Sequence, residues 1–306
     1  MIEILKAPPF ATLQDAGFPA GRSFGLPPCG AMDPWLFSLA NRMAGNPREA
    51  AAIEWALGPG ELRCHVEMRI AVLGALVRGS DVAPEDPEQL VFTASAGSTV
   101  TIVPAPEHRF SYVAVGGGFA APLMLESRST YLPGGIGGHQ GRLLKSGDRL
   151  EVNRPAAPSR EEFAVSLSAP PHPHPVASAE DLTLRVTRGP QWSHFGERAH
   201  ELFLAARYTV SPSSDRMGYR LNGPAIHPRG PATLPSEAAC PGAVQIPDGG
   251  HPIVLMPDGP TVGGYPKLAV VVRADLRLLA QCLPERGIRF REVSLEEARA
   301  CYPEAL

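Results

Sequence analysis

The sequence predicts a mainly β protein with a few helices, arranged as two β-barrel domains in tandem. Short runs rich in valine and isoleucine recur along nearly the whole chain of 306 residues. Between them lie 31 glycines and 34 prolines, which favours many short strands joined by tight turns. A proline-rich stretch near the middle divides the runs into two sets. Many strands at short spacing, with few helices between them, are typical of barrels and not of βαβ sheets.

The first domain is expected over residues 1–153. Its clear helix begins at Pro34, because Asp33 can cap the first turn and Gly45-Asn46-Pro47 ends it. Turn signals such as Gly58-Pro59-Gly60 separate the strands. The expected strands are Ile2–Lys6, Glu54–Leu57, Leu62–Val66, Arg69–Leu73, Leu90–Thr93, Val100–Val103, Ser111–Val115 and Arg149–Val152.

A linker or extended arm is expected over residues 154–180. Six prolines interrupt this stretch, and they break any regular element. His172 and His174 form a His-Pro-His-Pro run within it. Two histidines without further ligands nearby favour a solvent-exposed segment over a metal site.

The second domain is expected over residues 181–306. Its helices are predicted at His194–Ala205 behind a Ser193 cap, from about Asp275, and from Ser294, where Glu297 completes a capping box. The expected strands are Leu184–Thr187, Tyr208–Val210, Val244–Ile246, Ile253–Met256, Leu268–Val272 and Ile288–Arg291.

Composition excludes several classes of function. A net charge of −3 gives no electrostatic reason to bind nucleic acid or an anionic membrane. Five scattered cysteines without a CxxC pair favour neither a disulfide framework nor structural zinc, and they fit a reducing compartment. The first apolar run carries charges and no apolar stretch is long enough to span a membrane. We therefore expect a cytoplasmic protein without a metal site.

The stretch from Ile253 to Asp275 is the best candidate for a binding site. Two apolar runs that read as buried strands flank a polar loop too long for a two-residue hairpin. Gly263-Gly264 permits close approach of the main chain to a ligand, although a wide turn would also explain the pair. The candidate substrate-binding residues in this loop are Asp258, Thr261, Gly263, Gly264, Tyr265 and Lys267.

Two further polar stretches lie in the first domain. Leu13 to Gly17, followed by Gly30 to Asp33, reads as a turn and a helix cap or as part of a site. The glycine-rich stretch from Gly134 to Arg142 can cradle an anion through backbone amides. Neither a P-loop nor a dinucleotide fingerprint is present, and a flexible loop is the alternative. The candidate anion-binding residues are Gly137, Gly138, Arg142 and Lys145.

Two more polar stretches lie in the second domain. In Ser213 to Leu221, Asp215 and Arg216 either neutralise each other or hold a planar carboxylate or amide in a cleft. In Ser236 to Pro247, Gln245 lies within an apolar strand, so its amide needs partners from the backbone or from a ligand. No Gly-x-Ser-x-Gly elbow or His-x-x-x-His pair occurs. The residues alone thus predict a two-barrel protein with a polar, amide-binding cleft.

These stretches, in this order and spacing, resemble the allophanate hydrolase subunit 2 family, also called urea amidolyase-related carboxyltransferase proteins. Its stand-alone bacterial members include the C subunit of 5-oxoprolinase. The resemblance covers nearly the whole chain. Its most specific parts are Gly30-Ala31-Met32-Asp33, Ala40-Asn41 with Gly45-Asn46, Ser214 to Leu221, Pro241 to Pro247 and Gly263-Gly264-Tyr265-Pro266-Lys267.

The resemblance implies two cyclophilin-like β-barrels, a smaller partner (the B subunit, also called subunit 1), and a third, ring-opening subunit in the oxoprolinase system. In related urea carboxylases the equivalent region receives carboxybiotin. Two positions depart from the family pattern. Phe18 replaces a common arginine, for which Arg22 is the nearby alternative, and Val262 replaces a frequent threonine.

The resulting hypothesis is a subunit of an ATP-dependent 5-oxoprolinase, using ATP with Mg²⁺ and acting on a cyclic amide together with its partners. Asp215 and Glu237 are assigned to the amide N–H, Arg216 and Lys267 to oxygen or phosphate, and Gln245 to orientation. Asp215, Arg216 and Glu237 are the predicted catalytic residues. The alternatives are a carboxyltransferase that receives biotin on another protein, because the chain has no Met-Lys or Lys-Met dipeptide, and a non-catalytic regulatory partner of the B subunit.

Overall fold

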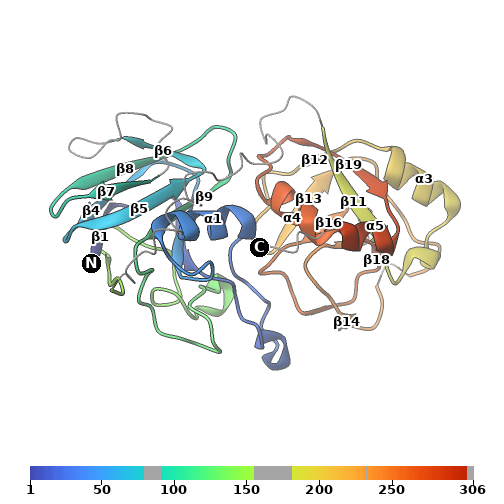
Figure 1. Cartoon of the computed structure of the whole chain (residues 1–306). Coiled ribbons are helices and arrows are strands. Elements are labelled where there is room, and N and C mark those ends of the chain that lie inside the picture. The colour runs from blue at the N-terminus through green and yellow to red at the C-terminus, as the bar shows by residue number, and fades with distance from the viewer. Residues whose placement is uncertain (79–90, 155–180, 232, 302–306) are drawn as a thin grey trace. The chain divides into compact units, whose positions relative to one another are not determined.

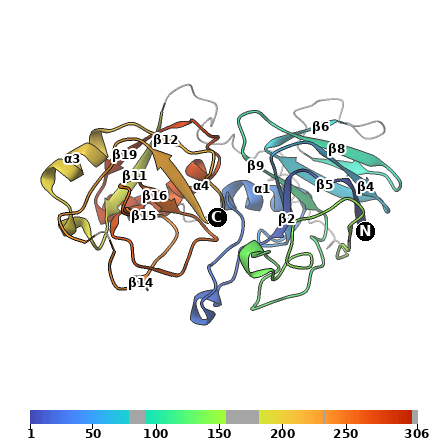
Figure 2. The same cartoon turned by 180° about the vertical axis from the view of Figure 1, so that it is seen from behind.

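The computed structural model describes residues 1–78, 91–154, 181–231 and 233–301. The chain divides into two compact units, Met1–Ala20 with Cys29–Pro175 and Gly21–Pro28 with Val176–Leu306. Figures 1 and 2 show both units from opposite sides. The sequence places residues 21–28 in the first domain, but they belong to the second unit. The predicted linker, with His172 and His174, lies outside the described residues except for Arg154.

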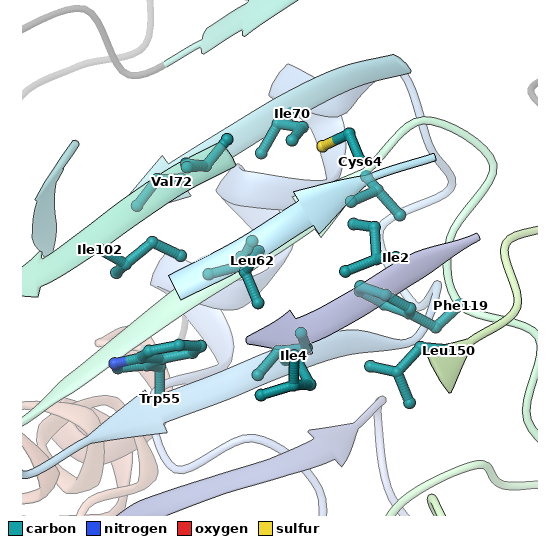
Figure 3. Close-up of a cluster of buried hydrophobic side chains, with 14 of the residues drawn as sticks. Ile2, Ile4, Trp55, Leu62, Cys64, Ile70, Val72, Ile102, Phe119 and Leu150 are labelled. Carbon is teal, nitrogen blue, oxygen red and sulfur yellow. The ribbon is translucent and has the colours of Figure 1, made fainter. Parts of the chain in front are cut away.

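The first unit consists of two five-stranded antiparallel sheets that share one core. Ile4 and Leu62 from one sheet meet Trp55 and Val72 from the other sheet in that core (Figure 3). The barrel expected here is therefore open, and its two sheets face each other. In sheet order the strands are β10 (Arg149–Leu150), β1 (Ile2–Lys6), β4 (Gly60–Cys64), β8 (Thr99–Pro104) and β6 (Ala75–Arg78), then β2 (Phe10–Gln14), β3 (Ala52–Ala56), β9 (Phe110–Val115), β5 (Met68–Leu73) and β7 (Val91–Ala94).

Helix α1 (Pro34–Ala44) begins and ends as predicted. The Asp33 side chain accepts a hydrogen bond from Leu36 N, and Gly45 ends the helix in the left-handed conformation. The start of α1 is held by the fully buried Glu54, whose Oε2 accepts from Met32 N and from the Tyr112 hydroxyl, each at 2.8 Å. Burial and the adjacent Glu54 carboxylate raise the pKa of Tyr112. The Gly30 to Asp33 stretch therefore has a structural role.

The second unit is a closed barrel in the order β11-β18-β15-β16-β13-β12-β19, which closes through the parallel pair of β19 and β11. The strands predicted on either side of the polar loop, β16 and β18, do not pair with each other, because both pair with β15. The barrel strands are β11 (Leu182–Arg188), β18 (Lys267–Val271), β15 (Ala243–Gln245), β16 (Ile253–Leu255), β13 (Gly218–Asn222), β12 (Tyr208–Val210) and β19 (Gly287–Glu292).

The helices of the second unit lie close to the predicted positions. Helix α3 (Glu197–Ala205) begins after Gly196, so the predicted Ser193 cap is wrong; Ser193 lies in the 3-10 turn η3 (Trp192–His194). Helix α4 (Arg273–Ala280) contains the buried Asp275 in its first turn. Helix α5 (Leu295–Ala300) has the predicted capping box between Ser294 and Glu297. The remaining short elements are η1 (Gly21–Phe24) and η2 (Leu132–Gly134).

Five strands were not predicted, and most of them are short or polar. β13 lies in the polar stretch Ser213 to Leu221, for which the sequence predicts no strand, although Tyr219 and Leu221 are buried and the neighbouring Arg220 is exposed. A strand of five residues with two charged or amide side chains gives too weak an alternation to be recognised. The other four are β2, β6, and the two-residue strands β14 (Glu237–Ala238) and β17 (Val262–Gly263), which pair with each other outside the barrel.

Candidate functional site

The centre of the candidate site is an ion pair at the start of β18. Lys267 is only 4 % exposed, and its Nζ donates to Glu237 Oε1 on β14 at 2.5 Å. Glu237 has a side chain that is 43 % exposed, so the pair joins a buried cation to a carboxylate at the surface. Among the described residues Glu237 is the one hydrogen-bond acceptor of this ammonium, which has three N–H donors. Two donors of a nearly buried cation are therefore left for a ligand or water.

Gln191 fixes this pair, and sequence reasoning missed it. Its Oε1 accepts from Lys267 N at 2.9 Å, and its Nε2 donates to Glu237 Oε1 at 2.6 Å. The turn after β11 brings it there, because a Cβ on Gly189 would lie 2.2 Å from Lys267 O and only glycine allows that approach. The one signal in the sequence is the Gly-Pro-Gln that follows a predicted strand, which by itself indicates no more than a turn.

Glu237 is ionised more readily than an ordinary glutamate. The hydrogen bond from Lys267 lowers the pKa of the Glu237 carboxyl, and the Gln191 amide and the charge of His194 add to this effect. The cluster of Gln191, Glu237 and Lys267 thus contains a carboxylate whose ionised form is favoured by its hydrogen bond from the Lys267 side chain.

Gln245 lies beside this cluster with an unused carboxamide. It is 4 % exposed, and it is the register partner of Lys267 across β15 and β18 and of Ile253 on β16. A Cβ on Gly263 would lie 3.0 Å from Gln245 Nε2, so β17 runs over this side chain. No hydrogen bond joins the carboxamide to any residue of the described chain. The predicted residues Glu237, Gly263, Gln245 and Lys267 therefore come together.

Other residues of the predicted loop have structural contacts. Thr261 Oγ1 donates to Gly25 O at 3.3 Å, and its carbonyl accepts from Ala239 N. Gly264 O accepts from Leu234 N at 2.7 Å, and a Cβ there would lie 2.6 Å from Leu234 O. Position 264 thus requires glycine, because its backbone lies too close to the Leu234 carbonyl for a side chain to fit. Tyr265 is 40 % exposed on the same loop.

Arg216 and Asp258 pair at the other end of the barrel strands. Arg216 Nε and Nη2 donate to the two oxygens of Asp258 at 2.8 and 2.7 Å, and both side chains are at least 95 % buried. Arg216 lies just before β13 and Asp258 just after β16, at the end where Gly218 pairs with Leu255. Gln245 pairs with Ile253 at the opposite end of β16. This fork is satisfied within the chain, so the contact of Arg216 with substrate oxygen or phosphate is not supported.

Asp215 does not neutralise Arg216. It is exposed, and its Oδ1 accepts from Met217 N and Gly218 N at 2.8 and 3.2 Å, which closes a turn before β13. The predicted role of Asp215 at the amide N–H is therefore not supported by its contacts.

Residues 21–28, which belong to the second unit, form an arm that contacts the residues next to β14 and β17. Arg22 Nη2 donates to Ala239 O, and Gly25 O accepts from Thr261. Arg22, the alternative cation in the sequence, therefore holds a loop and not an anion. Phe18 is buried and lies against Gly137, at 3.5 Å from a Cβ placed there.

The glycine-rich stretch of the first unit is packed against the chain itself. A Cβ on Gly137 would lie 2.0 Å from Ser129 O, and one on Gly138 would lie 1.8 Å from Thr130 Oγ1. Arg142 donates to both oxygens of Asp148, at 2.7 and 2.8 Å. Lys145 is exposed and its backbone N donates to Asp148. These contacts explain the glycines and Arg142 without a bound anion, and anion binding stays a prediction.

The Arg142–Asp148 pair predicts a pH-dependent stability. Hydrogen bonds from Arg142 lower the pKa of the Asp148 carboxyl from 3.8 to about 2. A lowered folded-state pKa stabilises the fold above the unfolded value, and this stabilisation is lost as the pH falls from about 4 towards 2. We expect Asp148→Asn to cost about 1–2 kcal/mol at neutral pH and progressively less below about pH 4, measured by urea unfolding.

The matched control for this prediction is Asp248→Asn, because Asp248 is exposed and hydrogen-bonded to no residue of the described ranges. It should change the free energy of unfolding by less than about 0.5 kcal/mol at any pH. A cost of Asp148→Asn that stays constant down to about pH 2 would contradict the ion pair as its cause.

A surface groove of about 490 Å³ lies along α3 and holds none of the predicted site residues. Within the described ranges, no group of three or more His, Cys, Asp or Glu side chains is placed to hold a metal ion. No helix of the described chain has the length and apolar character to cross a membrane.

Comparison with known proteins identifies the family. The carboxyltransferase domain family, subdomains A and B, matches residues 24–292. The chain belongs to this family. It is 35% identical to the C subunit of 5-oxoprolinase from Escherichia coli (strain K12), over 97% of this chain and 93% of that protein. It is 33% identical to urea amidolyase of Lachancea kluyveri, over 97% of this chain but only 17% of the relative.

The fold of the chain also matches that of a relative whose crystal structure is known. The crystal structure of Kluyveromyces lactis urea carboxylase matches with a TM-score of 0.86 and 30% identity, covering 97% of this chain and 28% of that chain. The mainly β, barrel-like fold predicted from the sequence is confirmed. The chain thus spans nearly the whole length of the bacterial relative and matches only a small part of the fungal enzymes.

Proposed function

We propose that the chain is the C subunit of an ATP-dependent 5-oxoprolinase, which converts 5-oxo-L-proline, ATP and two molecules of water to L-glutamate, ADP and phosphate. The observation that carries this proposal is the buried Lys267 ammonium, with two unused donors, beside the unused carboxamide of Gln245. The near full-length kinship to a 5-oxoprolinase C subunit supports it. The chain acts with a partner like the B subunit (subunit 1) and a third, ring-opening subunit, and it is active only in that complex.

In the proposed reaction the residues of this chain bind and polarise the lactam. Lys267 donates to the carbonyl oxygen, where negative charge develops when the carbonyl carbon is attacked. Glu237 orients this ammonium, and Gln191 holds the Glu237 carboxylate and the backbone of Lys267. Gln245 orients the amide plane, because its carboxamide has both a donor and an acceptor to offer. Glu237 is thus a positioning residue in this proposal.

ATP with Mg²⁺ enters as the co-substrate of the assembled enzyme. The glycine-rich stretch does not fit a nucleotide cradle, because Gly137 and Gly138 are packed on Ser129 and Thr130 and Arg142 is paired with Asp148. We therefore assign ATP binding to a partner protein. All five cysteines are free thiols, which fits the reducing cytoplasm as the site of the reaction.

The test is reconstitution of the chain with a B-subunit-like protein and a ring-opening subunit from the same organism. We expect ATP hydrolysis that depends on 5-oxoproline and on all three proteins, with one glutamate formed per phosphate released. Phosphate release and glutamate are measured in parallel, with each protein omitted in turn. Turnover that persists when this chain is omitted would show that the chain is not a required subunit of the enzyme.

The alternative is the carboxyltransferase part of a biotin-dependent urea carboxylase, and the match to urea amidolyase over 97% of the chain favours it. Biotin would arrive on another protein. Formation of carboxylated urea in the presence of a biotin carrier and its carboxylase, without turnover of 5-oxoproline, would select this alternative. A tight complex with the B-subunit-like protein and turnover of neither substrate would indicate a regulatory partner.

A further inference from the structure

Leu123 and Met124 form an exposed apolar knob on the first unit. Their side chains are 60 % and 38 % exposed. They lie at the start of a hairpin turn that Met124 and Ser127 close with two backbone hydrogen bonds, of 2.8 and 3.0 Å. One exposed leucine by itself is normal on a protein surface, but large apolar side chains side by side on one loop indicate contact with another protein.

The turn beside this knob has a backbone conformation that its residues do not favour. Its two central residues, Leu125 and Glu126, have φ angles of 46° and 65°, in the left-handed region. Two-residue hairpin turns with positive φ at both positions normally carry Asn-Gly, because larger side chains are strained there. Such strain persists only where the surrounding structure imposes it, and it is typical of functional sites.

Asp15 imposes this conformation from the buried side of the loop. Its Oδ1 accepts from Ser127 Oγ and Ser129 Oγ, each at 2.6 Å, and its Oδ2 accepts from Arg128 N. Arg128 Nε also donates to Ala121 O at 2.9 Å, which ties the two ends of the loop together. These bonds give Asp15 a structural role and hold the knob in one conformation. A rigid knob loses little conformational entropy when it binds a partner.

The second unit has a groove of matching character along α3 (Figure 1). Its volume of about 490 Å³ has room for two aliphatic side chains, because a water molecule takes up only about 30 Å³. Leu202 on α3 is 41 % exposed in its wall, whereas the neighbouring Phe203 is fully buried. The apolar residues that line the groove are Ala199, Leu202, Ala205, Ala225 and Ile226. Within the described chain, α3 thus leaves apolar surface uncovered.

The charged residues beside the knob and in the groove are complementary. Arg198 and Glu201 line the groove. Glu126 is exposed next to the knob, and the half-buried Arg128 follows two positions later. Glu126 can therefore face Arg198 while Arg128 faces Glu201. Opposite charges placed in this way at the rim of an apolar contact fix its register and exclude other partners.

We propose that the Leu123–Met124 knob of one molecule enters the α3 groove of a second copy of this chain. The contact is heterologous, because it joins two different patches and each copy carries both of them. The inference does not depend on the proposed function, since neither patch contains a residue of the cluster of Gln191, Glu237 and Lys267.

Self-association is measured on the full chain by sedimentation velocity over a range of concentrations, with thermal unfolding as the check of the fold. We expect the wild type to associate reversibly, and less as salt is added. The knob variant carries Leu123→Gln and Met124→Gln, and the groove variant carries Leu202→Gln and Ala205→Gln. Each should weaken association by about tenfold or more. The matched control is Leu295→Gln, at a position 59 % exposed outside both patches, which should change association by less than about twofold.

A mixture of the knob variant and the groove variant tests whether the two patches meet each other. The knob variant keeps an intact groove, and the groove variant keeps an intact knob. An equal mixture should therefore associate more strongly than either variant alone, which is expected only for a heterologous contact.

The charged rim gives a second test of the same contact. Glu126→Arg and Arg198→Glu should each weaken association by about fivefold, because each places like charges opposite each other. Both substitutions in one chain should restore association to within about twofold of the wild type.

A wild-type chain that stays monomeric at its highest soluble concentration would overturn the inference. So would association that survives in the knob variant, or a mixture that associates no better than its components. If the knob variant loses binding to a different protein while its self-association is unchanged, the knob serves that protein and the inference is wrong.

Discussion

Lys267→Met is expected to lower 5-oxoproline-dependent turnover of the reconstituted enzyme by about 100-fold or more. Methionine fills the same space but removes the ammonium that donates to the carbonyl oxygen. The fold should change little, because Glu237 is 43 % exposed and is solvated when its partner is lost. The measurement is kcat and kcat/KM from glutamate formation, with the thermal unfolding of each variant.

The small number of lysines makes this prediction specific to one side chain. The chain contains 28 lysines and arginines, and only three of them are lysines, at positions 6, 145 and 267. Lys267 is the buried one. Lys267→Arg should not restore activity, because a planar guanidinium is larger and cannot occupy the place of the ammonium.

The matched control is Arg188→Met, a cation of the same barrel that pairs with Glu292 and is 63 % exposed. It should leave turnover within about twofold, because an exposed ion pair contributes little. Turnover of Lys267→Met within about threefold of wild type would exclude Lys267 from contact with the reacting carbonyl.

Arg216→Met is expected to destabilise the second unit by about 3–5 kcal/mol. The reason is that Asp258, with a side chain 2 % exposed, would keep a buried charge without its partner. The measurement is urea unfolding together with hydrogen exchange of the peptides that contain β13 and β16. Activity per folded molecule should stay near the wild-type value.

Two further variants test whether the unpaired charge of Asp258 causes this loss of stability. Arg216→Met combined with Asp258→Leu should recover most of the loss, because removing both charges also removes the uncompensated one. Asp215→Ala, at the adjacent exposed position, should cost only about 1 kcal/mol, since it loses hydrogen bonds to two backbone amides. If Arg216→Met is stable but inactive, Arg216 contacts substrate as the sequence first indicated.

The sequence by itself determined the local features of this protein. Asp33 and Gly45 delimit α1, and Ser294 with Glu297 caps α5, because these signals act between residues a few positions apart. The valine-rich runs determined most barrel strands for the same reason. The polar stretches of the sequence also placed Glu237, Gln245, Gly263 and Lys267 among the candidate site residues, together with Asp215 and Arg216.

Only the tertiary structure decided which of these residues work together. Arg216 is next to Asp215 in sequence but pairs with Asp258, and Gln191 meets Lys267 across 76 positions. Strand pairing brings distant residues into contact and turns neighbouring side chains to opposite faces. A cation and a carboxylate in a motif therefore indicate polar chemistry, but burial and register decide whether they stabilise the fold or remain available to a ligand.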